Sequence, residues 1–483
     1  MTKESLRKQF EKIKNESTLA LEDKATPAHV RALVASLISL FEIMIIVFME
    51  KKVRKTSSNS GLPPSQGFGS NGNRNTGKGR RQNLTNEVSN IKTTETVEIV
   101  TPQDCRDCGA DLTEQKVIAT EERVKFDIIY EVIRHTVICE VKDCEICGKK
   151  NKGEFPEDMK GPVQYGTSIK IMIIDFLCVQ MMSLQRTQEH FLGLIKRVMS
   201  QANMLKYILK FSDSLKEWEE RQIEAILKMK VIHCDETSTR INKLLFWVHS
   251  YSYGNITLKF VHAKRGLDAI IDIGIIPWYG GIIVHDCWAS YFKFKNVLHA
   301  ICGAHILREL KFIEESNAYA WANLMKELLK EAAGVIRNRP DKRVLTQDEF
   351  NKLQNEYRKI LKAGLNEMPV FLDTEGEKLS AKNTDAQNLW LRLNKYESSV
   401  LMFAHIKEVD FTNNRAERDL RDSKTKQKNA GCFRTFEMAK AFYRISSYIK
   451  SMRYKGYSSL EAISLGAKKT FFLTKMKIKR NSK

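Results

Sequence analysis

The sequence lacks several features that define whole classes of protein. Its first residues, Met1 to Lys14, are charged and contain no apolar core, so we expect no signal peptide. No internal repeat is present. Acidic residues are scarce relative to basic ones, with 58 Asp and Glu against 79 Lys and Arg, which gives a net charge of +21. This excess favours a polyanionic partner such as nucleic acid, and ribosome-associated and membrane-surface proteins share it.

Long apolar runs are also scarce, and the most apolar one covers residues 33–49. Its 17 residues are at the lower length limit of a membrane span, and Glu42 lies in its middle. Alternating steps of four and three connect the large apolar side chains Leu33, Leu37, Leu40, Met44 and Val47. Because this is the spacing of a coiled-coil seam, we predict an oligomerising or buried helix within residues 1–55, with a membrane anchor as the alternative.

Two segments are basic and lack the pattern of packed elements. Residues 56–92 are dominated by Ser, Asn and Gly, and Pro63-Pro64 would break any helix. We predict a flexible basic linker there, which is either a solvated spacer or a segment that tracks DNA. Residues 456–483 are predicted to form a basic C-terminal tail, since from Lys468 onward they hold seven basic residues and no acidic one.

The ten cysteines do not resemble the disulfide framework of a small secreted protein, because the chain is long and four of them form two C-x-x-C pairs. A reducing, intracellular compartment is the expected setting. Each pair is followed by a glycine, which lets two thiolates face one tetrahedral zinc ion. The pairs lie between short alternating strands within residues 93–154, and consist of Cys105 with Cys108 and Cys144 with Cys147. We predict a structural zinc module, with reduced surface thiols as the alternative.

The rest of the chain alternates between helical and strand patterns, which predicts a multidomain α/β protein. Residues 155–230 contain an apolar helix followed by two more, and form either a helix-turn-helix-like DNA-binding region or a plain helical bundle. Short β-rich runs occupy residues 231–302, long helical patterns occupy residues 303–405, and further helices occupy residues 406–455.

Three acidic residues far apart in the sequence are candidates for one site. Asp235 and Asp286 each follow an apolar run that is predicted to be a buried strand, so both can lie at one edge of a sheet. Aspartate also occurs at strand ends for turn formation alone, which is the alternative for each. Glu417 lies in the helical stretch NNRAERDLR, on a face that also carries amides and cations; an exposed ion-pair partner is the alternative for this residue.

These residue types suit phosphoryl transfer. Carboxylates are the ligands that hard Mg²⁺ or Mn²⁺ ions prefer, and two such ions about 3.5–4 Å apart stabilise both oxygens of an in-line displacement. Shortly after the second aspartate, Cys302 and His305 form a C-x-x-H pair. The pair is half of a metal site, a structural hydrogen-bonding pair or a chance spacing, and the spacing favours the structural role.

Together, these blocks resemble the insertion-sequence-sixty-six family of bacterial and archaeal transposases. The resemblance is carried by HCDETSTRINKLLFWVHS, GGIIVHDCWASYFKF, HAICGAHILRELKF and the block from FTNNRAERDLR to GCFRT, and it extends through most of residues 55–465. It implies a ribonuclease-H-like core with a mixed sheet and a helical insertion at 303–405. It also implies that Asp235, Asp286 and Glu417 form a DDE triad that holds two Mg²⁺ or Mn²⁺ ions.

The resemblance further implies metal-dependent cleavage at transposon ends, followed by attack of the freed 3′-hydroxyl on target DNA. We expect DNA contacts from Arg421, Lys424, Lys426 and Lys428, a homo-oligomer, accessory proteins of the same element, and a prokaryotic, cytoplasmic and nucleoid-associated location without a membrane. A catalytically inactive, zinc-containing DNA-binding protein derived from a transposase is the alternative. The apolar helix at 33–49 and the basic tail depart from the family pattern.

Overall fold

The structure is a computed structural model that describes residues 13, 27, 29–31, 33–38, 97–125, 131–157, 159, 161–340, 344–368 and 383–471 of the chain. Three sequence predictions lie wholly or partly outside these residues: the oligomerising helix at 33–49, the basic linker at 56–92 and the last part of the basic tail. Within the described part of the chain, no helix combines the length and the apolar character that a membrane crossing requires.

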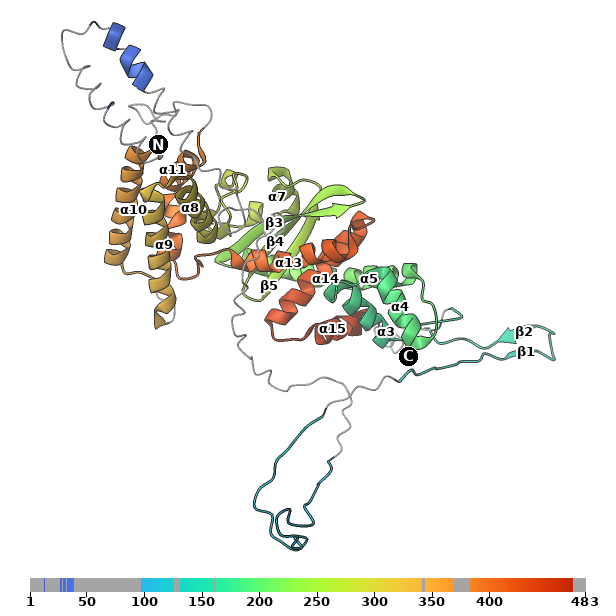
Figure 1. Cartoon of the computed structure of the whole chain (residues 1–483). Helices are drawn as coiled ribbons and strands as arrows, with labels where there is room; N and C mark the ends of the chain where they lie inside the picture. Colours follow the sequence, from blue (N-terminus) through green and yellow to red (C-terminus); the bar gives the residue numbers. More distant parts are fainter. Residues whose placement is uncertain are drawn as a thin grey trace.

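A mixed five-stranded sheet forms the centre of the fold, in the order β5-β4-β3-β6-β7 (Figure 1). Strands β3, β4 and β5 are antiparallel neighbours, whereas β6 pairs in parallel with both β3 and β7. Four of these strands confirm the predicted β-rich runs, and β7 is an additional strand. The strands are β3 (Val231–Ile241), β4 (Leu244–Tyr253), β5 (Ile256–His262), β6 (Ile282–His285) and β7 (Leu298–Ile301).

Both faces of this sheet are buried, which explains the nearly continuous apolar runs of its strands. On one face, Ile232 and Cys234 of β3 pack with residues of α6 and α7. On the other face, Val248 of β4 and Val261 of β5 pack with α13 and α14. These helices are α6 (Lys216–Leu227), α7 (Leu267–Ile273), α13 (Asn414–Ala430) and α14 (Phe436–Tyr454).

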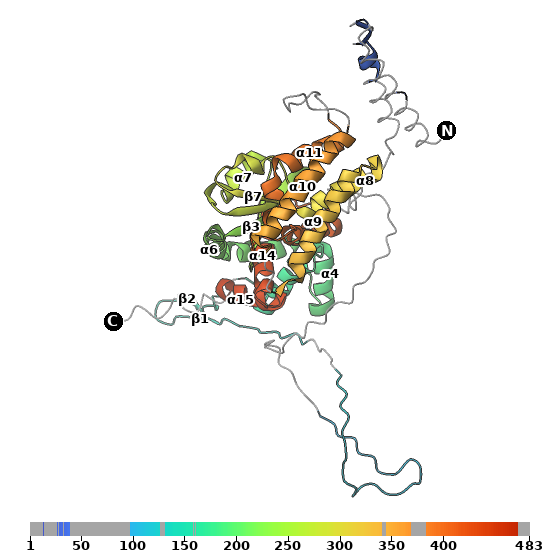
Figure 2. The same ribbon diagram turned by 90° about the vertical axis from the view of Figure 1, so that its left-hand side faces the viewer.

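A helical insertion separates β7 from α13 in the sequence and lies beside one end of the sheet in Figure 1, and Figure 2 views the molecule from the side of this insertion. Its apolar core is continuous with Val231, Ile282 and Val284 of the sheet, so the insertion is packed onto the strands. Helices α9 and α10 approach closely where Gly364 meets Trp321, because a Cβ atom at Gly364 would lie 2.8 Å from the indole. The helices are α8 (Gly303–Asn317), α9 (Ala320–Asn338), α10 (Gln347–Glu367), α11 (Asp385–Lys395) and α12 (Glu397–Val400).

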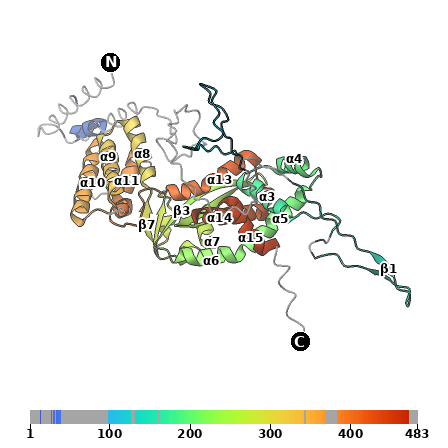
Figure 3. The same cartoon turned by 90° about the horizontal axis from the view of Figure 1, so that it is seen from below.

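The helices that precede the sheet form a second group on the side opposite the insertion, as Figure 3 shows. The predicted apolar helix is α3, continued by a π-helical turn, and three helices rather than two follow it before β3. Helix α15 joins this group through buried Ala462, Ile463 and Ala467, so the tail predicted from residue 456 begins with a packed helix. The elements are α3 (Thr167–Ile174), η2 (Asp175–Val179), α4 (Leu184–Ile195), α5 (Gln201–Ser214) and α15 (Ser459–Phe471).

The cysteine-containing segment differs from its prediction. Its described residues contain only two short strands, β1 (Val141–Asp143) and β2 (Lys150–Lys152), which pair as a hairpin around the second C-x-x-C. The predicted strands on either side are absent from residues 97–125 and 131–140. Ile99 and Ile133, which the alternating pattern would bury, are 86% and 85% exposed, so no packing stabilises an extended sheet there.

Candidate active site

One candidate aspartate lies in a strand and the other directly follows the neighbouring strand. Asp235 is in the middle of β3 and not at a strand end, as the sequence suggested, because pairing with β4 extends β3 to Ile241. Asp286 directly follows β6. The parallel register of β3 and β6 pairs His233 with Val284, so the same register places Asp235 opposite Asp286.

Glu417 lies near these two aspartates, in the first turn of α13, which packs on β3. Its backbone N–H donates to the carbonyl of Asn413, so the residue belongs to a regular first helical turn. The charges of Glu417 and Asp286 both act on Asp235, and the three carboxylates therefore converge. Asp235 lies in a strand, Asp286 directly follows one and Glu417 lies in a helix, and these residues are 51 and 131 positions apart in sequence.

The electrostatics of this group fit a bound cation. Burial raises the pKa of Asp235 well above its usual range, and the charges of Glu236, Asp286 and Glu417 raise it further. Atoms Oδ1 of Asp286 and Oε1 of Glu417 are buried and accept no hydrogen bond from any described residue. A divalent cation would offset the crowded negative charge and give these oxygens a partner, and an all-carboxylate donor set suits Mg²⁺ or Mn²⁺.

Asn413 joins the elements that carry these carboxylates. Its side chain is buried, and Nδ2 donates to the carbonyl of Cys234 at 2.7 Å. Its Oδ1 accepts from Nδ1 of His233 at 3.0 Å, and its backbone N–H donates to Sγ of Cys302 at 3.1 Å. Asn413 thus ties the start of α13 to β3 and to the end of β7, which fixes the position of Glu417. The sequence placed Asn413 on the helix face but gave no sign of this role.

A second buried carboxylate lies next to Asp235 and was not predicted. Glu236 accepts two hydrogen bonds from Arg265, at 2.8 and 2.5 Å, and one from the hydroxyl of Tyr291 at 2.9 Å. The guanidinium of Arg265 lies 4.9 Å from the ring of Trp247 and 4.3 Å from the ring of Trp288. Burial, followed by the charge of Asp286, raises the pKa of Glu236 to about 7, while Arg265 opposes this shift. The D-E dipeptide is visible in the sequence, but nothing there links it to Arg265.

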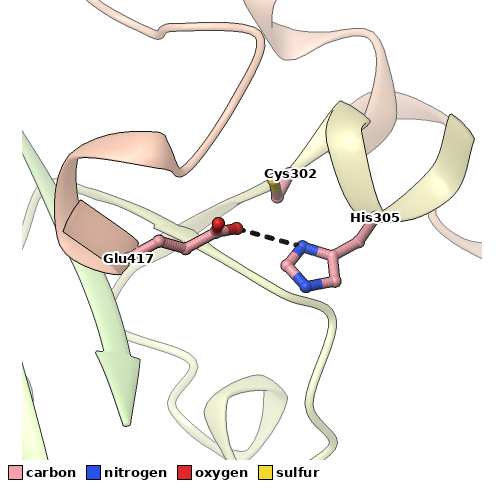
Figure 4. Close-up of side chains that lie close together, drawn as sticks. All are labelled: Cys302, His305 and Glu417. Atoms are coloured by element: carbon pink, nitrogen blue, oxygen red, sulfur yellow. Dashed lines mark ion pairs between the residues drawn. The ribbon is translucent and has the colours of Figure 1, made fainter. Parts of the chain in front are cut away.

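The C-x-x-H pair adjoins Glu417 (Figure 4). Cys302 and His305 lie at the N-terminus of α8, and their ligand atoms and one carboxylate oxygen of Glu417 are all within 4.8 Å of one another. Nδ1 of His305 is 3.7 Å from Oε1 of Glu417, and Nη2 of Arg308 is 3.6 Å from the same oxygen. Burial lowers the pKa of His305, so its imidazole is held neutral.

Comparison with known families shows the family of the chain. The model of the Transposase IS66 family matches residues 162–441, which is more than half of the 483 residues. The chain belongs to this family. The matched segment contains the three carboxylates and the C-x-x-H pair, and it supports a role as a transposase, an enzyme that acts on DNA. No curated protein gave a match to the chain.

The four basic residues expected to contact DNA are not equivalent in this IS66-family transposase. Arg421 and Lys428 are exposed on α13. Lys424 donates to the hydroxyl and carbonyl oxygens of Ser238, at 2.9 and 3.2 Å. Lys426 donates to the carbonyls of Leu177 and Met182 at the end of η2, at 3.1 and 3.4 Å. The ammonium groups of Lys424 and Lys426 are therefore engaged within the protein.

The two cysteine pairs of the transposase form similar turns in separate places. In each, the glycine after the pair has a positive φ, +74° at Gly109 and +65° at Gly148, and its N–H donates to the carbonyl of the first cysteine at 2.8 Å. Backbone N–H groups within each turn lower the pKa of Cys105 and of Cys144. Among the described residues, however, no group of three or more close ligands includes these cysteines. The two thiols of each pair therefore lie in one tight turn, and the two pairs are not brought together.

Proposed function

We propose that this protein is a DDE transposase that cleaves DNA at transposon ends and transfers the freed strand into target DNA, with Asp235, Asp286 and Glu417 as the catalytic carboxylates. The observation that carries the proposal is the convergence of these three residues within the segment that matches the family. Two of their buried oxygens have no hydrogen-bond partner among the described residues, which is the state expected of metal ligands before the metal binds.

The three carboxylates would hold two Mg²⁺ or Mn²⁺ ions. When bound, such ions stabilise the attacking and leaving oxygens of an in-line phosphoryl displacement. The protein's own part is positioning: Asp235 is fixed by strand pairing on both sides of β3, and Glu417 is fixed by Asn413 at the start of α13. No covalent link between enzyme and DNA is needed, because water and the 3′-hydroxyl serve as nucleophiles.

The strand order supports the assignment of a ribonuclease-H-like core. Three antiparallel strands are followed by two parallel ones, with helices on both faces, and the long helical insertion lies between β7 and α13. We propose that residues 231–302 and 406–455 form this catalytic core and that residues 303–405 are the insertion. Helices within 155–230 would bind DNA, and the helix within 1–55 would mediate homo-oligomer formation.

DNA contacts are proposed for the exposed cations of α13 in the first place. Arg421 and Lys428 lie on the same helix as Glu417 and have exposed side chains, so they can reach a phosphate backbone close to the catalytic carboxylates. Lys424 and Lys426 would have to give up their contacts to Ser238 and to the end of η2 first. The cysteine pairs would bind structural Zn²⁺. Accessory proteins of the same element would complete the complex on nucleoid DNA in the cytoplasm.

A cleavage assay tests this proposal. Full-length protein is incubated with DNA that carries the inverted-repeat ends flanking the gene, in Mg²⁺ or Mn²⁺. Glu417→Gln should lower the rate of end cleavage by at least about 1,000-fold, because one metal ligand is lost, while DNA affinity changes less than about threefold. Glu437→Gln, an exposed glutamate in the first turn of α14, is the matched control and should cleave like wild type. Equal cleavage by wild type and Glu417→Gln would refute the triad. DNA binding without cleavage by either protein would favour an inactive DNA-binding derivative.

A further inference from the structure

Beside the carboxylate centre lies a second group of potential metal ligands with different chemistry. It consists of Cys302, His305 and Glu417, whose donor atoms are within 4.8 Å of one another (Figure 4). The first two are three residues apart at the N-terminus of α8, so both face the same side of that helix's first turn. Glu417 approaches from the first turn of α13.

Two of the three donors lack hydrogen-bond partners. Nδ1 of His305 and Oε1 of Glu417 are buried, and neither makes a hydrogen bond to any described residue. The two atoms are 3.7 Å apart, which is too far for a hydrogen bond. A nitrogen and an oxygen that bind one tetrahedral ion with bonds of about 2.0–2.2 Å are separated by roughly 3.3–3.6 Å, so a small approach of the two side chains would let them share an ion.

We propose that Cys302, His305 and Glu417 form a site for Zn²⁺ or a similar borderline cation, distinct from the all-carboxylate centre and sharing only Glu417 with it. A thiolate, an imidazole and a carboxylate are the donors that zinc prefers, whereas Mg²⁺ rejects sulfur. Three protein ligands leave the fourth tetrahedral position to solvent. The separation of up to 4.8 Å among the donors requires side-chain movements of about 1 Å to close the site.

The surroundings of Cys302 would support a metal-bound thiolate. The backbone N–H of Asn413 donates to its Sγ at 3.1 Å, and the N-terminus of a 15-residue helix begins at the next residue. Two features oppose binding. Burial raises the pKa of the Cys302 thiol to about 11, so the ion must displace a proton, and the guanidinium of Arg308 lies 3.6 Å from Oε1 of Glu417. Metal affinity should therefore weaken as the pH falls.

A functional consequence follows if the catalytic proposal is also correct, and this step depends on it. Glu417 cannot complete the carboxylate centre while its oxygen is bound to zinc in the adjacent site. Zinc would then inhibit Mg²⁺-dependent cleavage by taking a ligand, without competing for the same position. The C-x-x-H pair would then have a chemical role beyond the hydrogen bond that Cys302 accepts from Asn413.

Cobalt is the probe that reports the sulfur ligand directly, because a thiolate bound to Co²⁺ gives a near-ultraviolet charge-transfer absorption. Full-length wild type and Cys302→Ser are titrated with Co²⁺, and the difference spectrum removes the signal of the four paired cysteines common to both proteins. We expect a difference of one equivalent of thiolate-bound Co²⁺, which stoichiometric Zn²⁺ displaces and millimolar Mg²⁺ does not. Cys287→Ser, a partly buried cysteine outside the cluster, is the control and should match wild type.

The two other ligands give independent tests. His305→Ala and Glu417→Gln should each weaken Co²⁺ binding at this site at least about tenfold, with circular dichroism confirming that both variants fold. A missing difference signal, or one unaffected by both variants, would overturn the site. If no thiolate-bound Co²⁺ is detected but Glu417→Gln still abolishes cleavage, the zinc site is wrong and the catalytic proposal stands. If Co²⁺ binds as expected but Glu417→Gln cleaves like wild type, the catalytic proposal is wrong and the zinc site stands.

Discussion

The carboxylate centre and the cysteine pairs are both groups of potential metal ligands, but they are built in opposite ways. Asp235, Asp286 and Glu417 are held by a paired sheet and a packed helix, and their surroundings are buried. The cysteine pairs lie in a segment whose apolar side chains are exposed, such as Ile118 at 97% and Ile146 at 97%. The first site is preorganised by packing, whereas the second has only its local turns.

This difference indicates what a bound metal would contribute at each proposed site. Packing of the core holds the carboxylates close together although they repel one another. A cation bound there would reduce this repulsion in a site that is already folded. In the cysteine segment, metal binding would itself supply the energy that orders the chain, as in small zinc modules. Changes that loosen the core should therefore affect catalysis most, and changes in the cysteine segment should leave the carboxylate centre intact.

The largest expected effect comes from removing the hydrogen bonds by which Asn413 joins the start of α13 to β3. Asn413→Ala leaves the carbonyl of Cys234 and the ring of His233 without their partner, at about 1–3 kcal/mol for each buried group. We expect loss of stability by several kcal/mol and a decrease in end cleavage of at least about 100-fold, because Glu417 is no longer fixed. Chemical denaturation and the cleavage assay measure the two effects.

The adjacent residue provides the control. Asn414 is exposed and begins α13 itself, so Asn414→Ala should change stability by less than about 0.5 kcal/mol and leave cleavage near wild type. If both asparagine variants behave alike, the core site is not held by Asn413, and the contrast between the two metal sites is weaker than proposed.

An intermediate effect is expected from Glu236, whose pKa is raised from 4.5 to about 7 mainly by burial. A carboxylate with a raised folded-state pKa contributes stability below pH 4.5, and this contribution is lost as the pH rises through 7. At 1.36 kcal/mol per pKa unit, the loss is at most roughly 3 kcal/mol. Glu236→Gln should remove this pH dependence in metal-free protein, measured by denaturation between pH 4.5 and 8.

Glu220→Gln, at an exposed position on α6, is the matched control and should preserve the wild-type pH profile. If the free energy of unfolding changes with pH in the same way for wild type and Glu236→Gln, burial does not raise the pKa of Glu236.

The smallest effects concern the cations of α13. Removing a phosphate contact lowers the slope of log affinity against log salt concentration by about 0.9, so Arg421→Ala and Lys428→Ala should each show a decrease of this order. Lys426→Met should leave the slope unchanged and lower the melting temperature, because its ammonium holds the end of η2. If all three variants and wild type show the same slope of log affinity against log salt concentration, α13 does not contact DNA phosphates.

The sequence predicted the parts of the fold that depend on local pattern. Apolar runs located four of the five central strands, and the positions of Asp235 and Asp286 after two of these runs predicted that they would be neighbours. The middle position of Asp235 was not predictable, because β3 extends past it only through pairing with β4. Helix α15 was not predicted, because the basic residues that follow it suggested a tail. Its residues Ala462, Ile463 and Ala467 are nevertheless buried.

The contacts that complete the site could not be predicted because they are tertiary. Glu417 was a candidate because its helix face also carries amides and cations, although a glutamate on a polar helix is ordinarily an exposed ion-pair partner. The roles of Asn413 and Arg265 depend on side chains brought together from distant elements. In the cysteine segment the alternating pattern was misleading, because alternation predicts a strand only where a neighbouring layer buries one face.

We propose that packing holds three carboxylates ready for hard divalent cations, independently of the cysteine pairs. Binding of Mn²⁺ to the full-length protein tests it most directly, with wild type, Asp286→Asn and Cys147→Ser compared by calorimetry or electron paramagnetic resonance. We predict that Asp286→Asn weakens Mn²⁺ binding at least about tenfold and that Cys147→Ser binds Mn²⁺ like wild type. Unchanged Mn²⁺ binding by Asp286→Asn, or equal loss in both variants, would contradict the account.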